Sequence, residues 1–323
     1  MAHIADAVNA LSSFLAHEQI DSVEGLNSFF QSLPRKHDAE VQGFQPTDAI
    51  VFCASSVLSL ADRVFSALNK DNAGPSGQQL ITEGRNTVVV LCGGIGHSTP
   101  FLYEAVAKHP HYKAVGDEIQ GKPESRVLEL IAQRWFGIQV SEAGSEEAVI
   151  RPGDKNRLLV VAEDRSTNCG ANASESKRVL EACGVCSPRS IVVVQDPTMA
   201  KRTVATFEKT YAGTINGMPQ IVSWPTFTPR VRARLPSENE ADGDFLAQVG
   251  FVDGEARGGH VDGLWSMQRF VDLLMGEIPR LRDDANGYGP NGKGFLSHVD
   301  IPSTIEEAWK HIDSMLGSNG RAR

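Results

Sequence analysis

Short runs of apolar, largely β-branched residues recur through the middle of the chain, and this recurrence constrains the fold more than any other feature. A segment with helical periodicity follows each of the first four runs. The runs are continuous rather than alternating, so helices are expected to cover both faces of a parallel sheet. The sequence therefore predicts an α/β fold, a three-layer α/β/α and Rossmann-like domain with a mainly parallel sheet. The runs are DAIVFCASS at residues 48–56, TVVVLCGG at 87–94, RLLVVAED at 157–164, SIVVVQD at 190–196 and, as a candidate fifth strand, PQIVSWP at 219–225.

Helical periodicity without strand-like runs marks both ends of the chain. Residues 1–44 carry apolar residues at helical spacing. After residue 226, a polar stretch predicted to be a surface connection precedes an amphipathic helix, which Gly276 and Pro279 are expected to end. We therefore predict a ligand-binding α/β domain at residues 45–225. Residues 226–323, together with the N-terminal helices, are predicted to form a smaller, mainly helical domain that closes the cleft.

The composition narrows the class of partner. Acidic residues number 40 against 31 lysines and arginines, and this net charge of −9 disfavours nucleic-acid binding because a phosphate backbone needs a basic face. No apolar run approaches the roughly 20 residues that cross a bilayer, so no membrane partner is expected. The first residues lack the basic segment of a signal peptide, and five cysteines fit a reducing compartment. These features predict a cytoplasmic protein that binds a small molecule and could form oligomers.

Ligands of open parallel sheets bind beyond the carboxyl ends of the strands, so the residues after each run are the first candidates for a site. Small and polar residues gather after all four runs, which predicts a polar crevice, although turns alone also favour such residues. The candidates are residues 53–56 after the first run, residues 93–99 after the second, Glu163, Ser166, Thr167, Asn168 and Asn172 after the third, and Gln195, Asp196, Met199 and Arg202 after the fourth.

The loop CGGIGHST at residues 92–99 contains three glycines, a histidine and two hydroxyl residues. Glycine allows a ligand to approach the backbone closely, and free amides at a helix start favour an anion. The spacing matches neither the dinucleotide motif nor the phosphate loop, and no lysine follows. Two interpretations stay open: an anion site, or a tight turn in which Ser98 or Thr99 caps the next helix. His97 could act as a general acid or base, or orient a ligand.

Three further features also have alternative interpretations. Arg202 could bind a carboxylate or phosphate bidentately, form an ion pair with Glu163 or Asp164, or lie on a solvated helix face. The C-x-x-C motif at residues 183–186 follows a helix, whereas redox motifs usually open one, so a structural role is favoured. The glycine-rich residues 279–295 form either a lid over the strand ends or a self-contained loop.

Four motifs in succession resemble the DUF218 family: CGGIGHST, the glutamate of GKPESRVL (Glu124), EDRSTNCGANA and VVVQDPTMAKRT. The similarity runs from about residue 48 to residue 211 and resumes in GLWSMQRF, GEIPRLRDDANGYGPNGKGF and HVDIP. The resemblance implies an α/β/α domain, a smaller helical domain and a cleft between them. Its soluble YdcF-like members imply S-adenosylmethionine as the cofactor. The family residues carried over are Gly93, Gly94, Glu124, Glu163, Ser166, Thr167, Asn168, Asn172, Met199 and Arg202.

One departure separates this chain from other DUF218 members. Many members have a serine-x-tyrosine-histidine stretch where this chain has QDPT at residues 195–198. The chain also lacks the membrane segments with which the cell-envelope relatives begin. The resemblance therefore implies a ligand more directly than it implies a reaction.

The leading hypothesis is an S-adenosylmethionine-binding enzyme that transfers a group from this cofactor to a small acceptor. Glu163 or Glu124 would hold ribose hydroxyls or the amine, while the glycine-loop amides and Arg202 would hold the methionyl carboxylate. His97 or Asp196 would remove a proton from the acceptor. The predicted catalytic residues are His97, Asp196 and Glu124, and the predicted cofactor-binding residues are Gly93, Gly94, Gly96, Ser98, Thr99, Glu163, Ser166, Thr167, Asn168, Asn172, Gln195, Met199 and Arg202; no metal is predicted.

Two alternatives stay open. One is a hydrolase or phosphatase that acts on a small anionic substrate at the same loop, and turnover of phosphate esters would favour it. The other is a non-catalytic cofactor-binding protein, which tight binding of S-adenosylmethionine without consumption would favour. On the leading hypothesis, Gly94→Val is expected to abolish binding and leave the fold largely intact.

Overall fold

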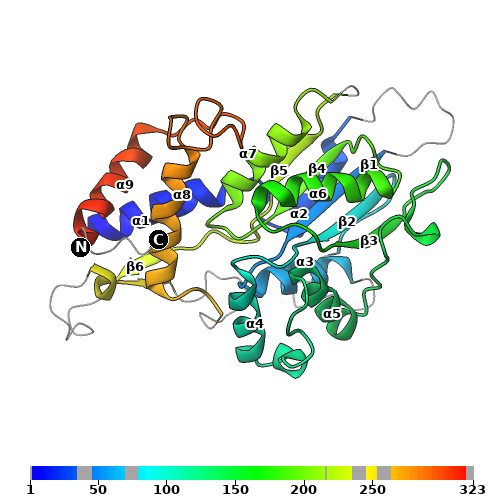
Figure 1. Cartoon of the computed structure of the whole chain (residues 1–323), viewed down its shortest axis with the longest axis horizontal. Coiled ribbons are helices and arrows are strands. Elements are labelled where there is room, and N and C mark those ends of the chain that lie inside the picture. The colour runs from blue at the N-terminus through cyan, green and yellow to red at the C-terminus, as the bar shows by residue number, and fades with distance from the viewer. Residues whose placement is uncertain are drawn as a thin grey trace.

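A five-stranded sheet lies between layers of helices (Figure 1). The computed structural model describes residues 2–34, 46–69, 79–214, 217–234, 245–252 and 263–317. The strands are β1 (Thr47–Cys53), β2 (Asn86–Cys92), β3 (Leu158–Glu163), β4 (Ser190–Val194) and β5 (Gln220–Ser223). Their spatial order is β3-β2-β1-β4-β5, and every neighbouring pair is parallel. The predicted α/β, Rossmann-like fold with a parallel sheet is therefore confirmed, and the candidate fifth strand is part of it.

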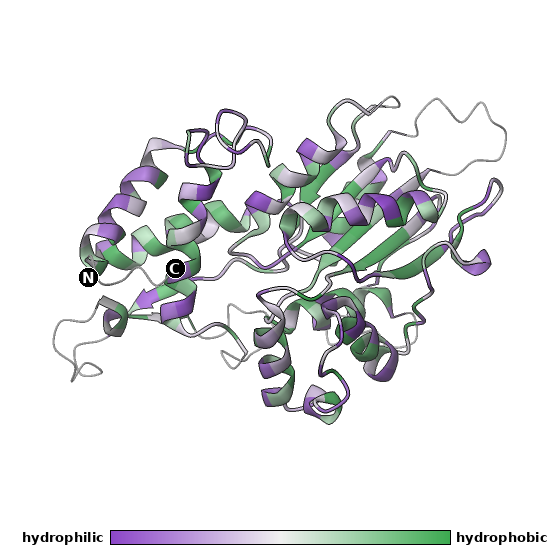
Figure 2. Cartoon of the chain, viewed as in Figure 1, coloured by the Kyte–Doolittle hydropathy of each residue, from purple (hydrophilic) through white to green (hydrophobic). Residues whose placement is uncertain are grey.

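Alternate residues of the strands face opposite sides of the sheet, and the two sides belong to separate hydrophobic cores. In β1, Ala49 and Val51 belong to one core, while Ile50 and Phe52 belong to the other. The first core includes residues of α6 (Cys169–Ala182) and α7 (Ala200–Tyr211), and the second includes residues of α2 (Val23–Ser32), α3 (Ser59–Leu68), α4 (Thr99–Lys108) and α5 (Glu124–Phe136). Figure 2 shows the strands as hydrophobic, which is why their sequences lack the alternation of a sheet with one face in water.

A third group of helices lies on the left of Figure 1, beside the sheet. It contains α1 (Ala2–Ala16), α8 (Met267–Leu281) and α9 (Ser303–Leu316), with the antiparallel strands β6 (Val231–Ala233) and β7 (Val249–Phe251). Helix α1 packs against α9, α8 and β6. Part of the predicted surface connection is thus strand β6, which pairs with β7, and Val231 of this strand is buried. Short 3-10 helices occur at Tyr112–Val115, Glu146–Ala148 and Phe245–Gln248.

The two N-terminal helices have different neighbours. Whereas α1 joins the third group, α2 lies against the sheet, where Arg189 donates to the carbonyls of Phe30 and Leu33 at 3.2 and 3.4 Å. The proposed boundary between two domains stays a prediction. Within the described residues, no helix combines the length and the apolar character that crossing a membrane requires.

Helix α8 continues through Gly276 and Pro279 to Leu281, so the prediction that these two residues end it is wrong. Proline lacks the N–H that would donate to the carbonyl four residues earlier, which here belongs to Met275. Trp309 of α9 fills this gap, because its Nε1 donates to the Met275 carbonyl at 2.9 Å. The helix therefore tolerates a proline in its last turn without leaving that carbonyl unpaired.

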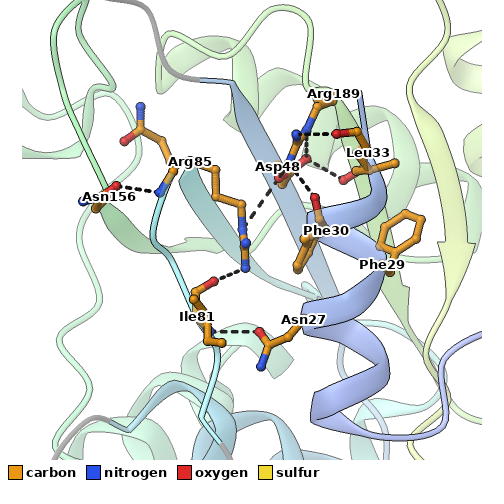
Figure 3. Close-up of polar contacts among 12 residues, drawn as sticks. Asn27, Phe29, Phe30, Leu33, Asp48, Ile81, Arg85, Asn156 and Arg189 are labelled. Atoms are coloured by element: carbon orange, nitrogen blue, oxygen red, sulfur yellow. Dashed lines mark hydrogen bonds and ion pairs between the residues drawn. The ribbon is translucent and has the colours of Figure 1, made fainter. Parts of the chain in front are cut away.

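A buried ion cluster lies at the amino end of the sheet (Figure 3). Asp48 has no exposed surface and accepts hydrogen bonds from Arg189 Nε at 3.0 Å and Ser190 Oγ at 2.7 Å. Arg85 Nε lies 3.7 Å from Asp48 Oδ2, and the Arg85 guanidinium carbon lies 4.3 Å from the centre of the Phe30 ring. Burial lowers the pKa of Arg85 to about 10, although Asp48 opposes the shift. Two buried guanidinium groups therefore share one carboxylate.

The glycine-rich loop after α8 is folded on itself. Tyr288 N donates to Arg280 O at 2.8 Å, and Gly292 N donates to Gly289 O at 3.0 Å. A Cβ atom at Gly287 would lie 1.8 Å from the Arg282 carbonyl oxygen, so only glycine fits there. These contacts favour the self-contained loop of the two interpretations.

His298 gives a testable prediction for this loop. Its Nδ1 lies 2.9 Å from Asp283 Oδ2 and its Nε2 lies 3.0 Å from Asp300 Oδ1, and both partners are carboxylate acceptors. The hydrogen bond with Asp283, then that with Asp300, raises the pKa of the imidazole above its ordinary value of 6.5. We expect an NMR titration to find this raised pKa, and Asp283→Asn to return it toward 6.5. An unshifted wild-type histidine would contradict the assignment.

The sign of the pH dependence follows from the direction of this shift. Because the folded-state pKa of His298 is raised, its stabilising contribution is complete below the unfolded-state pKa. The contribution is lost as the pH rises through the folded-state pKa.

Candidate functional site

The strand order reverses between β1 and β4, and ligands of doubly wound sheets bind beyond the carboxyl ends of such a pair. Residues 54–56 follow β1 and residues 195–198 follow β4. The loop after β2 adjoins the end of β3, because Gly93 N donates to Glu163 O at 3.0 Å. The candidate residues therefore lie in the loops and helix starts along one edge of the sheet, here called the carboxyl edge.

The amides of the three loop glycines are already paired within the protein. Gly94 N donates to Ser166 O at 2.7 Å, Gly96 N donates to Thr99 Oγ1 at 2.8 Å, and Gly93 N pairs with β3 as described. Ser98 is the N-cap residue of α4, but its side chain makes no capping hydrogen bond. In this conformation the glycine amides cannot also bind an anion, which favours the tight-turn interpretation for residues 93–96.

Gly94 is required by packing between two loops. A Cβ atom there would lie 2.4 Å from Ser166 O and 2.8 Å from Asp164 O, and both are backbone atoms that cannot rotate away. A larger side chain must therefore displace the loop after β3. This contact contradicts the expectation that Gly94→Val leaves the fold largely intact.

Glu124, the first residue of α5, is a buried carboxylate with one oxygen left open. The residue is 8% exposed, and its Oε1 accepts hydrogen bonds from Ser98 Oγ and Thr99 Oγ1, both at 2.9 Å. Its Oε2 lies beside Gly93 and accepts no hydrogen bond from the described residues. Burial raises the pKa of Glu124, while the hydroxyls of Ser98 and Thr99 oppose the shift. The structure thus brings Gly93, Ser98, Thr99 and Glu124 into one group.

Glu163 is fully engaged in local structure. Its Oε1 accepts from the amides of Arg165 and Ser166 at 2.7 and 2.9 Å. Its Oε2 accepts from Ser166 Oγ at 2.5 Å and from Cys92 Sγ at 3.1 Å. These four bonds shape the turn after β3, so Glu163 and Ser166 support the edge and offer no open polar atom to a ligand.

The remaining polar residues after β3 begin helix α6. Asn168 is the N-cap and accepts from Ala171 N at 3.0 Å, while Asn172 N donates to Asn168 O at 2.8 Å. Thr167 and Asn168 are exposed, and Asn172 is partly buried. Capping therefore accounts for Asn168, and Thr167 is accessible from solvent at the carboxyl edge.

Asp196 lies at the reversal point and contacts the third group of helices. It is 3% exposed; Oδ1 accepts from Thr198 N and Oγ1, at 3.0 and 2.7 Å, and Oδ2 accepts from Ser55 Oγ at 3.0 Å and Trp265 Nε1 at 3.2 Å. Burial raises the pKa of Asp196, and these donors oppose the shift. Gln195 is buried as well, and its Oε1 accepts from Asp196 N at 2.7 Å. A carboxylate with four donors is a poor general base in this conformation.

Arg202 pairs with a residue that none of its predicted roles included. Its Nε and Nη2 donate to the two oxygens of Glu277 on α8, with the second bond at 3.1 Å. Glu277 is 1% exposed and also accepts from Arg280 Nη1 at 2.9 Å. Arg202 is therefore a buried bridge between α7 and α8 and is not available to bind a ligand carboxylate. Met199, which precedes α7, is partly buried, and its carbonyl accepts from Thr203 N.

His97 is exposed, unlike the other two predicted catalytic residues, Asp196 and Glu124. It lies in the loop before α4, and its ring has no hydrogen-bond partner among the described residues. The structure does not bring it into contact with Asp196, whose four donors come from elsewhere. An exposed imidazole at the carboxyl edge can still exchange protons with a bound molecule.

The sequence did not mark Trp265, which precedes α8, or Glu277 of α8 as site residues, because their partners Asp196 and Arg202 are distant in the sequence. Ser55 was visible as a small polar residue after the first strand, but its contact with Asp196 spans 141 residues of sequence. Thr226, beyond β5, has φ of 68°, and its buried Oγ1 has no partner among the described residues. This backbone is costly for a β-branched residue and adds an unusual feature near the end of β5.

No protein-family model matches the chain. The resemblance to the DUF218 family therefore stays a prediction that rests on the motifs. The described residues contain no group of three or more histidine, cysteine, aspartate or glutamate side chains that could hold a metal ion.

Proposed function

We propose that this protein binds S-adenosylmethionine at the carboxyl edge of its sheet and transfers a group from it to a small acceptor. The observation that carries the proposal is the open Oε2 of buried Glu124, beside glycines whose amides are already paired. This part of the edge offers acceptors and negative charge, which favours a ligand rich in donors and positive charge. S-adenosylmethionine has a sulfonium, an ammonium and two ribose hydroxyls.

The turn after β1 supports an adenosyl ligand without a pyrophosphate. Rossmann folds bind dinucleotides at the reversal point, and a glycine-rich turn after the first strand receives the pyrophosphate. Here that turn is Cys53-Ala54-Ser55-Ser56, which has no glycine. An adenosyl group attached to a sulfonium needs no such turn, so the residues present fit it better than they fit a dinucleotide.

The roles of the residues follow from their contacts. Glu124 would accept hydrogen bonds from ribose hydroxyls or from the ammonium, while Ser98 and Thr99 hold its other oxygen. Asp196 and Glu163 would add negative potential without direct contact. The bound sulfonium supplies an activated carbon group, and the protein would orient the acceptor and exclude water. His97 is exposed and could accept a proton from the acceptor. The motifs shared with the DUF218 family support the same ligand.

Calorimetry with the full chain tests the proposal. Wild type is expected to bind S-adenosylmethionine, and Glu124→Gln to weaken binding roughly 10- to 100-fold, the range for a hydrogen bond with a charged partner. Glu129→Gln is the control. It removes an equal charge from the same helix, at a carboxylate that pairs with Arg126, and this variant should bind S-adenosylmethionine like wild type. Absence of heat and of a thermal shift for wild type at saturating ligand would refute the proposal.

A second candidate is a cofactor-binding protein that performs no transfer. It is favoured by the engagement of Asp196, a predicted catalytic residue, in four hydrogen bonds. Mass spectrometry of S-adenosylmethionine after incubation with candidate acceptors separates the two. Consumption of the cofactor supports the enzyme, and tight binding without consumption supports the second candidate.

A further inference from the structure

Arg269 is a cation on the first turn of α8, and its guanidinium has no acceptor among the described residues. Its guanidinium carbon lies 3.6 Å from the centre of the Phe101 ring, on the first turn of α4. Its Nε is buried and makes no hydrogen bond within the described part of the chain. Stacking on an aromatic ring holds the plane of a guanidinium and leaves its edge free to donate.

Two other arginines that connect elements near the carboxyl edge are paired with carboxylates. Arg202 donates to Glu277, and Arg126 pairs with Asp164. By contrast, no carboxylate among the described residues pairs with Arg269. A partly buried guanidinium without an acceptor costs free energy, and a ligand anion would recover that cost.

Arg269 and Glu124 both contact residues at the start of α4. Phe101 follows Ser98 and Thr99, whose hydroxyls donate to Glu124. The start of α4 therefore has an open carboxylate oxygen among its contacts and an unpaired guanidinium stacked on it. An α-amino acid carries the two complementary groups, an ammonium for the carboxylate and a carboxylate for the guanidinium.

We propose that Arg269 binds a carboxylate group of the ligand, the role that sequence analysis gave to Arg202. The inference rests on the proposed function where the carboxylate is that of the methionyl group of S-adenosylmethionine. A carboxylate on the acceptor has the same chemistry, and the experiment distinguishes these two sources. Phe101 is the positioning residue, because it holds the guanidinium plane.

The first arm compares two ligands that differ by one group. Calorimetry measures S-adenosylmethionine and decarboxylated S-adenosylmethionine on wild type and on Arg269→Gln. If Arg269 binds the methionyl carboxylate, the variant loses roughly 10- to 100-fold in affinity for the first ligand and keeps its affinity for the second. Retained binding of the decarboxylated ligand also shows that the variant is folded. Arg269→Lys keeps the charge without the planar fork and should lose less.

The second arm uses succinate as a carboxylate probe, with and without S-adenosylmethionine. Succinate binding to wild type that Arg269→Gln abolishes assigns the carboxylate to the acceptor. Arg178→Gln, an equal change of charge on the exposed face of α6, should leave both arms unchanged. If Arg269→Gln matches wild type in both arms, the proposal is overturned. The proposed function fails separately, when wild type gives no signal with either adenosyl ligand.

Discussion

Asp48→Ala is expected to lower the free energy of unfolding by about 3–5 kcal/mol, the range for removing one partner of a buried ion pair. Asp48 has no exposed surface, and its loss leaves Arg189 and Arg85 without the carboxylate with which both pair among the described residues. The same change removes the acceptor of Ser190 Oγ. Because the cluster joins β1 to the start of β4, its loss should weaken the pairing of these central strands.

Chemical denaturation measures this effect, with two matched variants beside it. Glu118→Gln breaks an exposed pair with Arg134 and should cost about 1 kcal/mol or less. Arg85→Met keeps packing against Phe30 and removes the surplus cation, so it should cost less than Asp48→Ala. If Asp48→Ala behaved like Glu118→Gln, the cluster would not be the stabilising unit described above.

Glu277→Leu is expected to cost a similar amount, about 3–5 kcal/mol, because it leaves Arg202 buried without a counter-charge. The pair connects α7, which covers the sheet, with α8 of the third group. Losing it should weaken the contact between these parts as well as the stability of each. Differential scanning calorimetry is the measurement, and a second, lower transition in the variant would report separation of the third group.

The double variant Arg202→Met/Glu277→Leu is the control for this prediction. Apolar residues of similar volume often replace a buried ion pair with little loss of stability. The double variant should therefore recover much of the stability that Glu277→Leu loses. A double variant as unstable as the sum of both single changes would show that the two residues do not act as a pair.

The sheet could be predicted from the sequence because its signal is local. A strand covered on both faces needs apolar residues at consecutive positions, and VVVLC in β2 or IVVV in β4 satisfies this need without reference to the rest of the chain. The end of α8 could not be predicted in the same way. Pro279 is tolerated because Trp309, 30 residues later in the sequence, supplies a donor to Met275.

The gathering of small polar residues at the carboxyl edge was also predictable, whereas the hydrogen bonding of these residues was not. Small polar residues after strands mark the carboxyl edge in any parallel sheet. Whether an arginine is free depends on contacts across the fold: Arg202 meets a glutamate 75 residues away, and Arg269 meets a phenylalanine. The pairing of the glycine amides could not be predicted either, because Gly94 N donates to a carbonyl of a neighbouring loop and Gly96 N donates to the side chain of Thr99.

The packing of α1 against α8 and α9 has a consequence for the order of folding. Helix α1 is synthesised before every strand of the sheet, but these partners are synthesised after all of its strands. Until they emerge, Val8, Leu11 and Leu15, which have no exposed surface in the folded protein, lack the cover that α8 and α9 give to their helix. Contacts between distant segments form late because a long loop must close first. We therefore expect the sheet to assemble during translation, while the apolar face of α1 stays exposed until α8 and α9 have been synthesised.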